Sequence, residues 1–448
     1  MVRLSRAGRG VGPAGRFAAV SAVLAEDYEE RCLWQAQVDP PATAHELPAD
    51  SVDVLVVGAG ICGLAAADAA ASRGRSVVVV DREPLGWGAS SRNGGMVIPE
   101  LKAGPAALAK KYGTVGTRMH EEVVEAFEFV EASATGTDGR GGIDCDWSVP
   151  GELYLAHSVH HVEHLRAMAR ELSDAGEAVH FVDRNDLHTE IGSEAFVGGV
   201  VLERTGAVHP AKLHAGLARR AMASGAVVCD RTAVESVTAE RGGHTVRTTR
   251  GTIRANDVII ATNAAADSAV PELERRVLPI GSFIIATEVL DPELAASVSP
   301  TGRMMVDTRN FLAYWRLTPD GRLAFGGRRN MEPVEIAEAR DFLYGRMVDI
   351  HPQLAGVPIR YAWGGHVAMT LDRLPHVGQL DGAWYATGCN GSGVALNTWL
   401  GHRLGLVVCG EAAPPAVAEL RHRPIPIRSL RSAYLPIVGR WFSFQDAR

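Results

Sequence analysis

Three glycines stand at residues 58, 60 and 63 in the order G-x-G-x-x-G, and an aspartate follows at position 81. Gly58 permits a tight turn, Gly60 lets backbone amides approach a pyrophosphate, and Gly63 lets a helix pack closely on a strand. Asp81 lies 23 residues beyond Gly58, where a carboxylate can bind ribose hydroxyls. The spacing predicts a dinucleotide site, and the acid disfavours the 2′-phosphate of NADP. The alternative is a glycine-rich turn in an ordinary βαβ unit.

These residues need a strand–helix–strand unit to position them, and the sequence predicts one. Residues 54–57 are wholly apolar, which is typical of a buried parallel strand. An alanine-rich stretch to about Ser72 reads as a helix that Gly74 ends. Residues 76–80 form a second buried strand that leads directly into Asp81.

The loop after Asp81 favours FAD over NAD as the cofactor. It reads REPLGWGASSRNGGM over residues 82–96. Its small residues, with Ser90, Arg92 and Asn93, can wrap a pyrophosphate and approach a flat ring through exposed amides. An NAD-binding protein would need no such loop and is the less favoured interpretation.

On this loop the sequence resembles the D-amino-acid-oxidase-like FAD oxidoreductases, and within them the branch of gamma-glutamylputrescine oxidoreductases, where GWGAS-RNGG is typical. Further similar motifs are GAVHPAKL (206–213), DVIIATNAAA (257–266), WGGHVAMTLDRLPHVGQL (363–380) and YATGCNGSGVALN (385–397). The resemblance covers most of the chain, from about Tyr28 onward. It implies FAD bound by Gly58, Gly60, Ile61, Cys62, Gly63, Asp81, Arg82, Gly88, Ala89, Ser90, Arg92, Asn93, Gly94, Gly95, Val234, Thr262, Gly391, Gly393 and Val394.

Two departures from relatives bear on the cofactor. Some relatives tether FAD through Cys or His, and the corresponding positions here are Gly365 and Asn93, so we expect non-covalent FAD. The sarcosine-oxidase branch has a lysine for oxygen activation where this chain has Ala324.

The helix expected from Val394 would place its positive N-terminus at the flavin's pyrimidine edge. The alternative is a plain strand–loop–helix corner.

The expected fold is α/β, a Rossmann-like FAD-binding domain with a second, largely antiparallel β-sheet substrate domain, as in glutathione-reductase-type FAD proteins. We assign residues 50–139, 200–275 and 359–425 to the FAD-binding domain, and 140–199 and 276–358 to the substrate domain. Residues 1–49 form a lead-in and helix, and 426–448 a tail.

Within the substrate domain, residues 282–289, 311–317 and 322–328 read as strands, the last two joined by a hairpin turn, TPDG. We expect this sheet to roof the flavin. Residues 106–135 read as a helix pair, and a helix ends before Pro352.

Four side chains are candidates for the chemistry. Tyr314 and Arg316 share one face of a roof strand, and Arg316 could clamp a substrate carboxylate; the alternative is a surface arginine. Arg328 corresponds to an active-site His of sarcosine oxidases, or is a solvated strand end. His366 is a pocket group or a satisfied buried histidine. Because a protonated amine has no lone pair to drive hydride loss, the pocket must favour the neutral amine.

The resemblance implies oxidation of the C–N bond of an amine or amino acid to an imine by hydride transfer to flavin N5. Water would hydrolyse the imine, and oxygen would reoxidise the flavin. The alternatives are a dehydrogenase with another electron acceptor and a non-catalytic flavoprotein.

Composition sets the remaining bounds. The net charge of -7 over 448 residues gives no support to nucleic-acid binding. Six scattered cysteines without metal-site spacing suit a cytoplasmic protein that holds no metal. No apolar run is long enough for a transmembrane segment. Residues 1–16 are basic and glycine-rich and read as a disordered lead-in. The apolar, arginine-bearing tail is expected to pack on the FAD domain, the alternative being a membrane or a partner.

Overall fold

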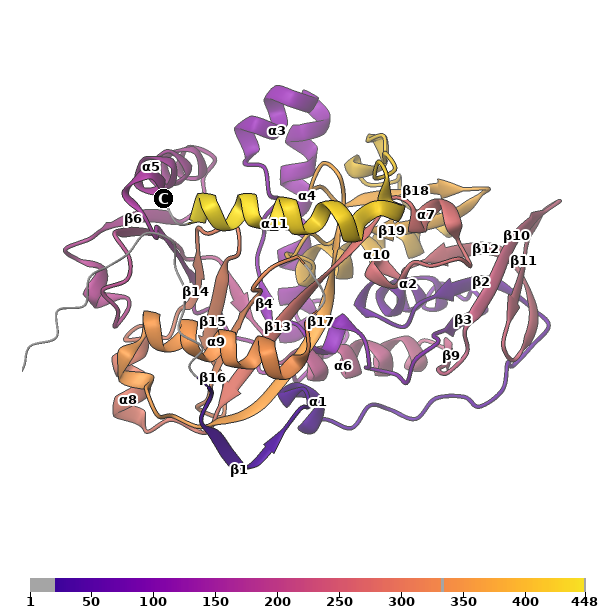
Figure 1. Ribbon diagram of the computed structural model, residues 1–448. Coiled ribbons are helices and arrows are strands. Elements are labelled where there is room, and N and C mark those ends of the chain that lie inside the picture. The colour runs from indigo at the N-terminus through magenta and orange to yellow at the C-terminus, as the bar shows by residue number, and fades with distance from the viewer. Residues whose placement is uncertain (1–20, 332–333, 447–448) are drawn as a thin grey trace, which may run out of the picture.

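The computed structural model describes residues 21–331 and 334–446, so the basic lead-in at 1–16 lies outside the described residues. Two β-sheets dominate the molecule, with helices around each (Figure 1). The glutathione-reductase-like division into a FAD-binding sheet and a largely antiparallel substrate sheet is confirmed.

The FAD-binding sheet is built on five parallel strands in the order β9-β3-β2-β12-β19. Their runs of valine and isoleucine are buried on both faces, which is why they do not alternate with polar residues. Antiparallel strands flank them. The bounds are β2 Ser51–Val57, β3 Val77–Val80, β9 Val227–Cys229, β10 Val234–Glu240, β11 Gly243–Thr248, β12 Gly251–Ile260, β18 His376–Leu380 and β19 Ala383–Thr387.

One face of this sheet is covered by helices. They are α2 Ile61–Ala71, α4 Thr114–Thr135, α6 Pro210–Ala223 and α10 Val394–Val408, with α3 Pro105–Tyr112 beside α4. Every residue of α2 is buried. Gly401 of α10 is in such close contact that an added Cβ would lie 1.9 Å from the Cys62 carbonyl oxygen of α2. The predicted helix pair over 106–135 is confirmed.

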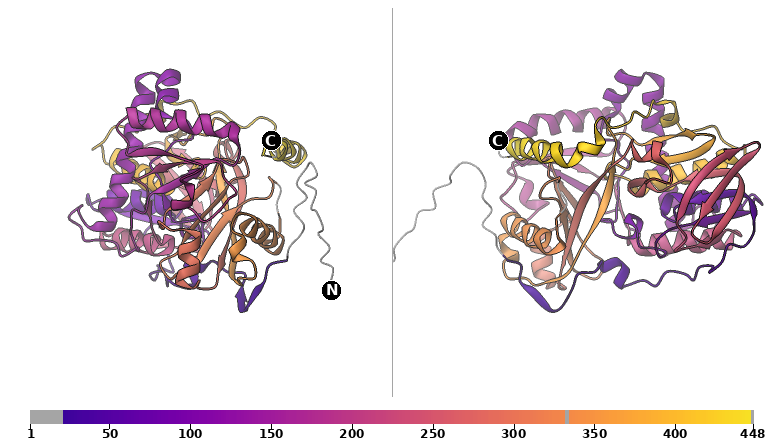
Figure 2. Two further views of the ribbon diagram at one scale, coloured as in Figure 1. Left: turned by 90° about the vertical axis from the view of Figure 1, so that its left-hand side faces the viewer. Right: turned by 45° about the vertical axis from the view of Figure 1, so that its right-hand side comes forward.

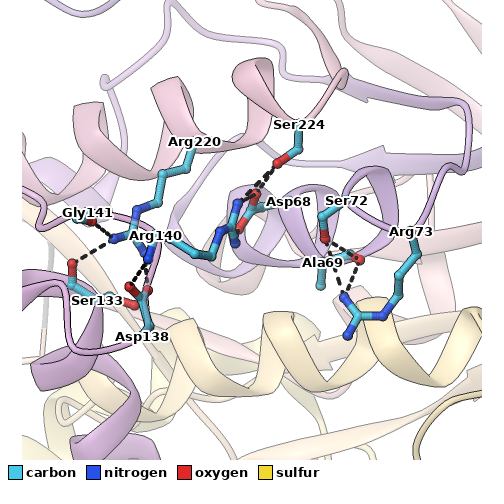
Figure 3. Close-up of polar contacts among 10 residues, drawn as sticks. All are labelled: Asp68, Ala69, Ser72, Arg73, Ser133, Asp138, Arg140, Gly141, Arg220 and Ser224. Atoms are coloured by element: carbon cyan, nitrogen blue, oxygen red, sulfur yellow. Dashed lines mark hydrogen bonds and ion pairs between the residues drawn. The ribbon is translucent and has the colours of Figure 1, made fainter.

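A charged cluster holds the C-terminal half of α2, around Asp68 (Figure 3). The buried Asp68 carboxylate accepts from Arg140 Nη2 and from Ser224 Oγ, at 2.7 Å each. Arg220 pairs with Asp138 at 2.7 Å and so fixes the loop that carries Arg140. Since an unpaired buried carboxylate is strongly destabilising, this cluster ties α2 firmly to its neighbours.

The substrate sheet has nine strands in the order β1-β17-β13-β16-β15-β14-β5-β7-β6. Pairing is antiparallel except for β1 with β17 and β14 with β5. The predicted hairpin at 318–321 joins β15 to β16. The bounds are β1 Leu24–Glu29, β5 Glu152–Leu155, β6 Val179–Asp183, β7 Gly198–Leu202, β13 Leu278–Thr287, β14 Met304–Asp307, β15 Ala313–Leu317, β16 Leu323–Gly327 and β17 Ile359–Met369, with the separate pair β4 Met96–Val97 and β8 Gly206–Ala207.

Alternation along these strands gives the substrate sheet two different faces. One packs its apolar side chains, such as Trp315 and Phe325, with α9 Ile336–Ile350 into a core. The other carries Tyr314 and Arg316 towards the FAD-binding domain. Strand β17, which the expected division places in the FAD domain, pairs with β13 in the substrate sheet. The other helices are α1 Leu33–Ala36, α5 Val159–Asp174, α7 Pro271–Glu274 and α8 Pro292–Val298.

Both ends of the described chain bind the substrate sheet. β1 pairs with β17, and the C-terminal helix α11, Arg431–Asp446, lies along the outside of the molecule (Figure 2). Leu435 of α11 packs on Leu278 and Ile280 of β13. The expectation that the tail packs on the FAD domain is therefore wrong for α11. Within residues 21–331 and 334–446, every helix is too short or too polar to cross a bilayer.

Candidate functional site

The turn between β2 and α2 can be formed only by glycine at two positions. Gly58 has φ +107°, and a Cβ there would lie 2.8 Å from the Ala261 carbonyl oxygen. A Cβ on Gly63 would lie 1.8 Å from the Gly58 carbonyl oxygen. These contacts bring the N-terminus of α2 against the end of β2, as the glycine spacing predicts.

The first amide of α2 faces the loop that follows Asp81. The Ile61 N–H donates to Ser90 Oγ at 3.0 Å, and a Cβ on Gly60 would lie 2.8 Å from that same oxygen. Gly88 precedes the short 3-10 turn Ala89–Ser91, which presents Ser90. An anionic pyrophosphate could take the place of the hydroxyl, since a helix N-terminus favours negative charge.

The acid at the end of β3 organises this edge. Asp81 Oδ2 accepts from the Ala59 N–H at 2.7 Å and Oδ1 from the Glu83 N–H at 2.9 Å, while burial raises the pKa of the Asp81 carboxyl. Arg82 forms an ion pair with Asp267. Thr262 Oγ1 is buried and has no hydrogen-bond partner among the described residues, so it is free to bind a polar group of a cofactor.

Two other predicted cofactor contacts are mainly packing residues at this edge. Val234 packs among the apolar ends of the parallel strands. Burial raises the pKa of the Cys62 thiol to about 12, so this thiol does not ionise near neutral pH.

The loop carrying Ser90 is held by indole groups from two distant segments. Trp34 Nε1 donates to the Asn93 carbonyl at 2.9 Å, and Trp363 Nε1 donates to the Arg92 carbonyl at 2.8 Å. Gln35 adds a bond to the Gly86 carbonyl at 2.6 Å. Sequence reasoning missed these contacts because Trp34 and Gln35 lie in the segment taken as a lead-in.

The Arg92 and Asn93 side chains serve the loop itself. Arg92 Nη1 donates to the Gly364 carbonyl at 3.2 Å, and its guanidinium lies 4.7 Å from the Trp87 ring centre. Burial lowers the pKa of Arg92. Asn93 Oδ1 accepts from the Gly95 N–H at 2.8 Å. These contacts shape the loop whose amides would meet the flavin.

Tyr314 fills the space between the two domains. A Cβ on Gly94 would lie 3.1 Å from its ring, and a Cβ on Gly326 would lie 2.2 Å from it. The hydroxyl lies 3.2 Å from Ser282 Oγ, and burial raises the pKa of the phenol. Tyr314 therefore lies directly against the loop of residues 82–96 that is predicted to meet the flavin, called the flavin loop below.

Arg316 shares that face, as alternation predicts, but it is not a surface residue. Its side chain is buried, Nη2 donates to the Val208 carbonyl at 2.7 Å, and its guanidinium lies 5.3 Å from the Trp34 ring centre. Burial lowers its pKa to about 10. A Cβ on Gly95 would lie 2.9 Å from Nη2, so Arg316 supports the flavin loop.

Arg328 follows β16 on the same face and is half-buried beside Tyr314 and Cys389. Its guanidinium has no hydrogen-bond or ion-pair partner in the part of the chain that the structure describes. Burial lowers the pKa of Arg328. An unpartnered guanidinium at this place can bind an anionic group.

His366 corrects the expectation of a pocket or buried histidine. Strand register pairs it with Gly281 and pairs Gly364 with Phe283, which puts His366 on the face turned away from the flavin loop, where it is exposed. The shift by one residue from Gly365 reverses the face. Gly365 does face the site, and a Cβ there would meet no atom within 4 Å.

The glycine loop before α10 closes the site from the FAD domain. Gly391 has φ +100° and open space around it, whereas a Cβ on Gly393 would lie 2.6 Å from Cys389 Cβ. Asn390 Nδ2 donates to the Gly388 carbonyl at 2.7 Å, which fixes the turn before Val394. The N-terminus of α10 therefore points out of a defined loop.

Two carboxyl groups near this loop were not predicted. Glu100 accepts from Lys102 Nζ and Ser392 Oγ, both at 2.5 Å, and 37% of its side chain stays exposed. Glu152 on β5 is buried, and one of its oxygens has no partner among the described residues. Burial, with Glu100 nearby, raises the pKa of Glu152 to about 8. The signal in the sequence was a Glu on the strand ELYL at a position that alternation turns inward.

FAD fits the features of this site. They are the α2 N-terminus, the lack of a side chain at Gly60, the unpartnered Thr262 hydroxyl, and the open space at Gly365 and Gly391. All six cysteines are free.

Comparisons with known proteins agree with a FAD-binding fold. Gamma-glutamylputrescine oxidoreductase of Escherichia coli (strain K12) is 32% identical over 404 residues, covering 88% of this chain and 92% of that protein. The crystal structure of glycine oxidase from Geobacillus kaustophilus matches with a TM-score of 0.73 at 22% identity, covering 84% of this chain and 100% of that one. L-proline dehydrogenase from P. horikoshii matches with a TM-score of 0.69 at 19% identity, covering 83% and 96%. The family model described as FAD dependent oxidoreductase matches residues 53–405, and the chain belongs to this family.

Proposed function

We propose that the protein oxidises the C–N bond of an amine or amino acid to an imine, which water then hydrolyses to a carbonyl compound and an amine or ammonia. The substrate carbon gives up a hydride and the nitrogen a proton. The names of two relatives, gamma-glutamylputrescine oxidoreductase and glycine oxidase, support this class of reaction. FAD, bound without a covalent link, would supply the two-electron acceptor.

The observation that carries the proposal is the unpartnered Arg328 guanidinium beside Tyr314, on the sheet face that looks towards the flavin loop. Arg328 would hold a substrate carboxylate, and the Tyr314 ring would limit where the substrate carbon can lie. Arg316, the earlier candidate for the carboxylate, already donates to Val208 and would instead hold the loop in place.

The pocket must also accept the substrate as a neutral amine, and Glu152 is the group suited to assist. A buried carboxyl with a raised pKa can exchange a proton near neutral pH, and Glu152 has an oxygen free to do so. Activity should rise with pH as the amine loses its proton. The α10 N-terminus would add positive potential beside the reduced cofactor.

The test is an anaerobic titration of the purified protein. Acid precipitation should release a yellow cofactor into the supernatant, which would support non-covalent FAD. A panel of amines and amino acids, each mixed with the protein without oxygen, should contain one that bleaches the visible flavin band. A yellow protein that no amine bleaches would contradict the proposal and favour a non-catalytic flavoprotein.

The electron acceptor is the second question. We propose oxygen as the electron acceptor. Another carrier is the alternative, because the oxygen-activating lysine of the sarcosine-oxidase branch corresponds here to the buried Ala324. Admitting air to the bleached protein distinguishes an oxidase from a dehydrogenase. The visible flavin band of an oxidase returns within a few turnovers, whereas that of a dehydrogenase returns slowly. The cytoplasmic location stays a prediction.

The matched variant test uses Arg328→Met. Loss of the cation should raise KM for carboxylate-bearing substrates by about 10- to 100-fold and leave plain amines unaffected. Equal effects on both substrate classes would contradict the role given to Arg328.

A further inference from the structure

Exposed apolar side chains gather in the C-terminal segment. Twelve large hydrophobic residues are exposed among those described, and five of them fall between residues 427 and 444. They are Ile427, Leu430, Ile437, Trp441 and Phe444. Single exposed apolar residues are ordinary, but such a concentration marks an interaction surface.

The helix α11 that carries most of them is firmly docked through its opposite face. Leu435 is buried against β13, and the Phe442 ring lies 6.1 Å from Phe311. The Asp446 carboxylate accepts from the Asn310 N–H at 2.7 Å and the Phe311 N–H at 3.0 Å. The outward face is therefore presented by a helix attached along its length.

That outward face is one continuous stripe. Ile437, Trp441 and Phe444 are spaced by four and three residues, so they lie on one side of the helix, with exposures of 68%, 58% and 49%. The Trp441 and Phe444 rings lie 6.2 Å apart. Figure 1 shows α11 in front of the other elements, and both views of Figure 2 show it at the edge of the molecule.

The charge of the segment is opposite to that of the chain. Residues 420–445 contain five arginines and no Asp or Glu, although the whole chain has a net charge of -7. Four of these arginines are exposed and have no ion-pair partner in the described part of the chain: Arg421, Arg423, Arg431 and Arg440. The segment thus combines an apolar stripe with unneutralised positive charge.

We propose that this face of α11 lies on an anionic lipid surface. Trp441, Phe444 and Ile437 would enter the headgroup region, and Arg431 and Arg440 of the same helix would bind lipid phosphates, as in interfacial amphipathic helices. A second copy of the chain fits less well, because it would bring two arginine-rich segments together. The inference does not depend on which substrate the protein oxidises.

The test uses the flavin-loaded full-length protein and sedimentation with lipid vesicles. Vesicles of phosphatidylglycerol mixed with phosphatidylcholine should carry the protein down at low salt, and vesicles of phosphatidylcholine alone should not. The triple variant Ile437→Ser/Trp441→Ser/Phe444→Ser should bind at least about tenfold more weakly while keeping its flavin and its thermal midpoint. The control Val159→Ser/Val289→Ser removes apolar groups exposed elsewhere and should bind like the parent protein.

Three results would overturn the proposal. One is failure of the parent protein to sediment with anionic vesicles. Another is undiminished sedimentation of the triple variant. The third is a concentration-dependent dimer that the triple variant abolishes, which would show that a second copy covers the stripe.

Discussion

Gly401 of α10 offers a sharp test of how the FAD domain is assembled. Replacing it by alanine would put a Cβ 1.9 Å from the Cys62 carbonyl oxygen and 2.7 Å from its carbonyl carbon. Ordinary contact begins at 3.4 Å, so the two backbones must separate by about 1.5 Å. Because α2 is buried on all sides and tied down by Asp68, α10 is the helix that would move.

The movement should weaken FAD binding. Overpacking of a well-packed core costs about 1–3 kcal/mol, and cofactor-free protein can relax this strain more easily than loaded protein. Since about 1.4 kcal/mol corresponds to a tenfold change, Gly401→Ala should bind FAD about 5- to 150-fold more weakly. The measurement is the FAD dissociation constant from quenching of flavin fluorescence, alongside the urea midpoint.

Two further alanine variants calibrate the effect. In Gly405→Ala the nearest backbone atom, the Ala66 carbonyl oxygen, is 2.5 Å away, so the required separation and the loss should be smaller. In Gly345→Ala, on α9, no atom lies within 4 Å, and the protein should keep its FAD affinity and gain up to about 1 kcal/mol of stability. Parent-like FAD affinity in Gly401→Ala would refute the reasoning.

Three other variants test the site. Arg316→Met leaves the Val208 carbonyl without its buried donor. The variant should lose about 1–3 kcal/mol of stability and retain less flavin. A rise in KM at unchanged stability would instead restore Arg316 as a carboxylate clamp. Glu152 has an unfolded-state pKa near 4.5 and a folded pKa of about 8, so its protonated form favours the native state; stability should fall as pH rises from 4.5 through 8, and Glu152→Gln should remove that part of the slope in urea titrations. Trp363→Phe removes the donor to the Arg92 carbonyl and should speed FAD dissociation about tenfold in stopped-flow release, with a structural role disproved if the rate is unchanged.

What the sequence predicted well was local. The glycine turn, the strand ending in Asp81 and the hairpin after β15 each depend on a few adjacent residues, so spacing alone identifies them. The same holds for Tyr314 and Arg316 sharing one strand face.

What it predicted poorly depends on distant partners. Trp34 binds a carbonyl 59 residues away, and no local pattern indicates this. His366 was misplaced because face assignment reverses with a shift of one residue, and only pairing with β13 fixes it. Arg316 could be a clamp or a surface group by sequence, because its real partner, the Val208 carbonyl, belongs to another domain.

The pairing of β1 with the late strand β17 constrains how the chain can fold as it is synthesised. β1 has its partner only when residues 359–361 have left the ribosome, and one side of α2 stays uncovered until α10 has been made. Such sequence-distant contacts fold slowly and leave apolar surface exposed in partial chains. Nascent protein shorter than about 400 residues should therefore depend on chaperones and be unable to retain its cofactor, which makes flavin capture one of the last steps of biogenesis.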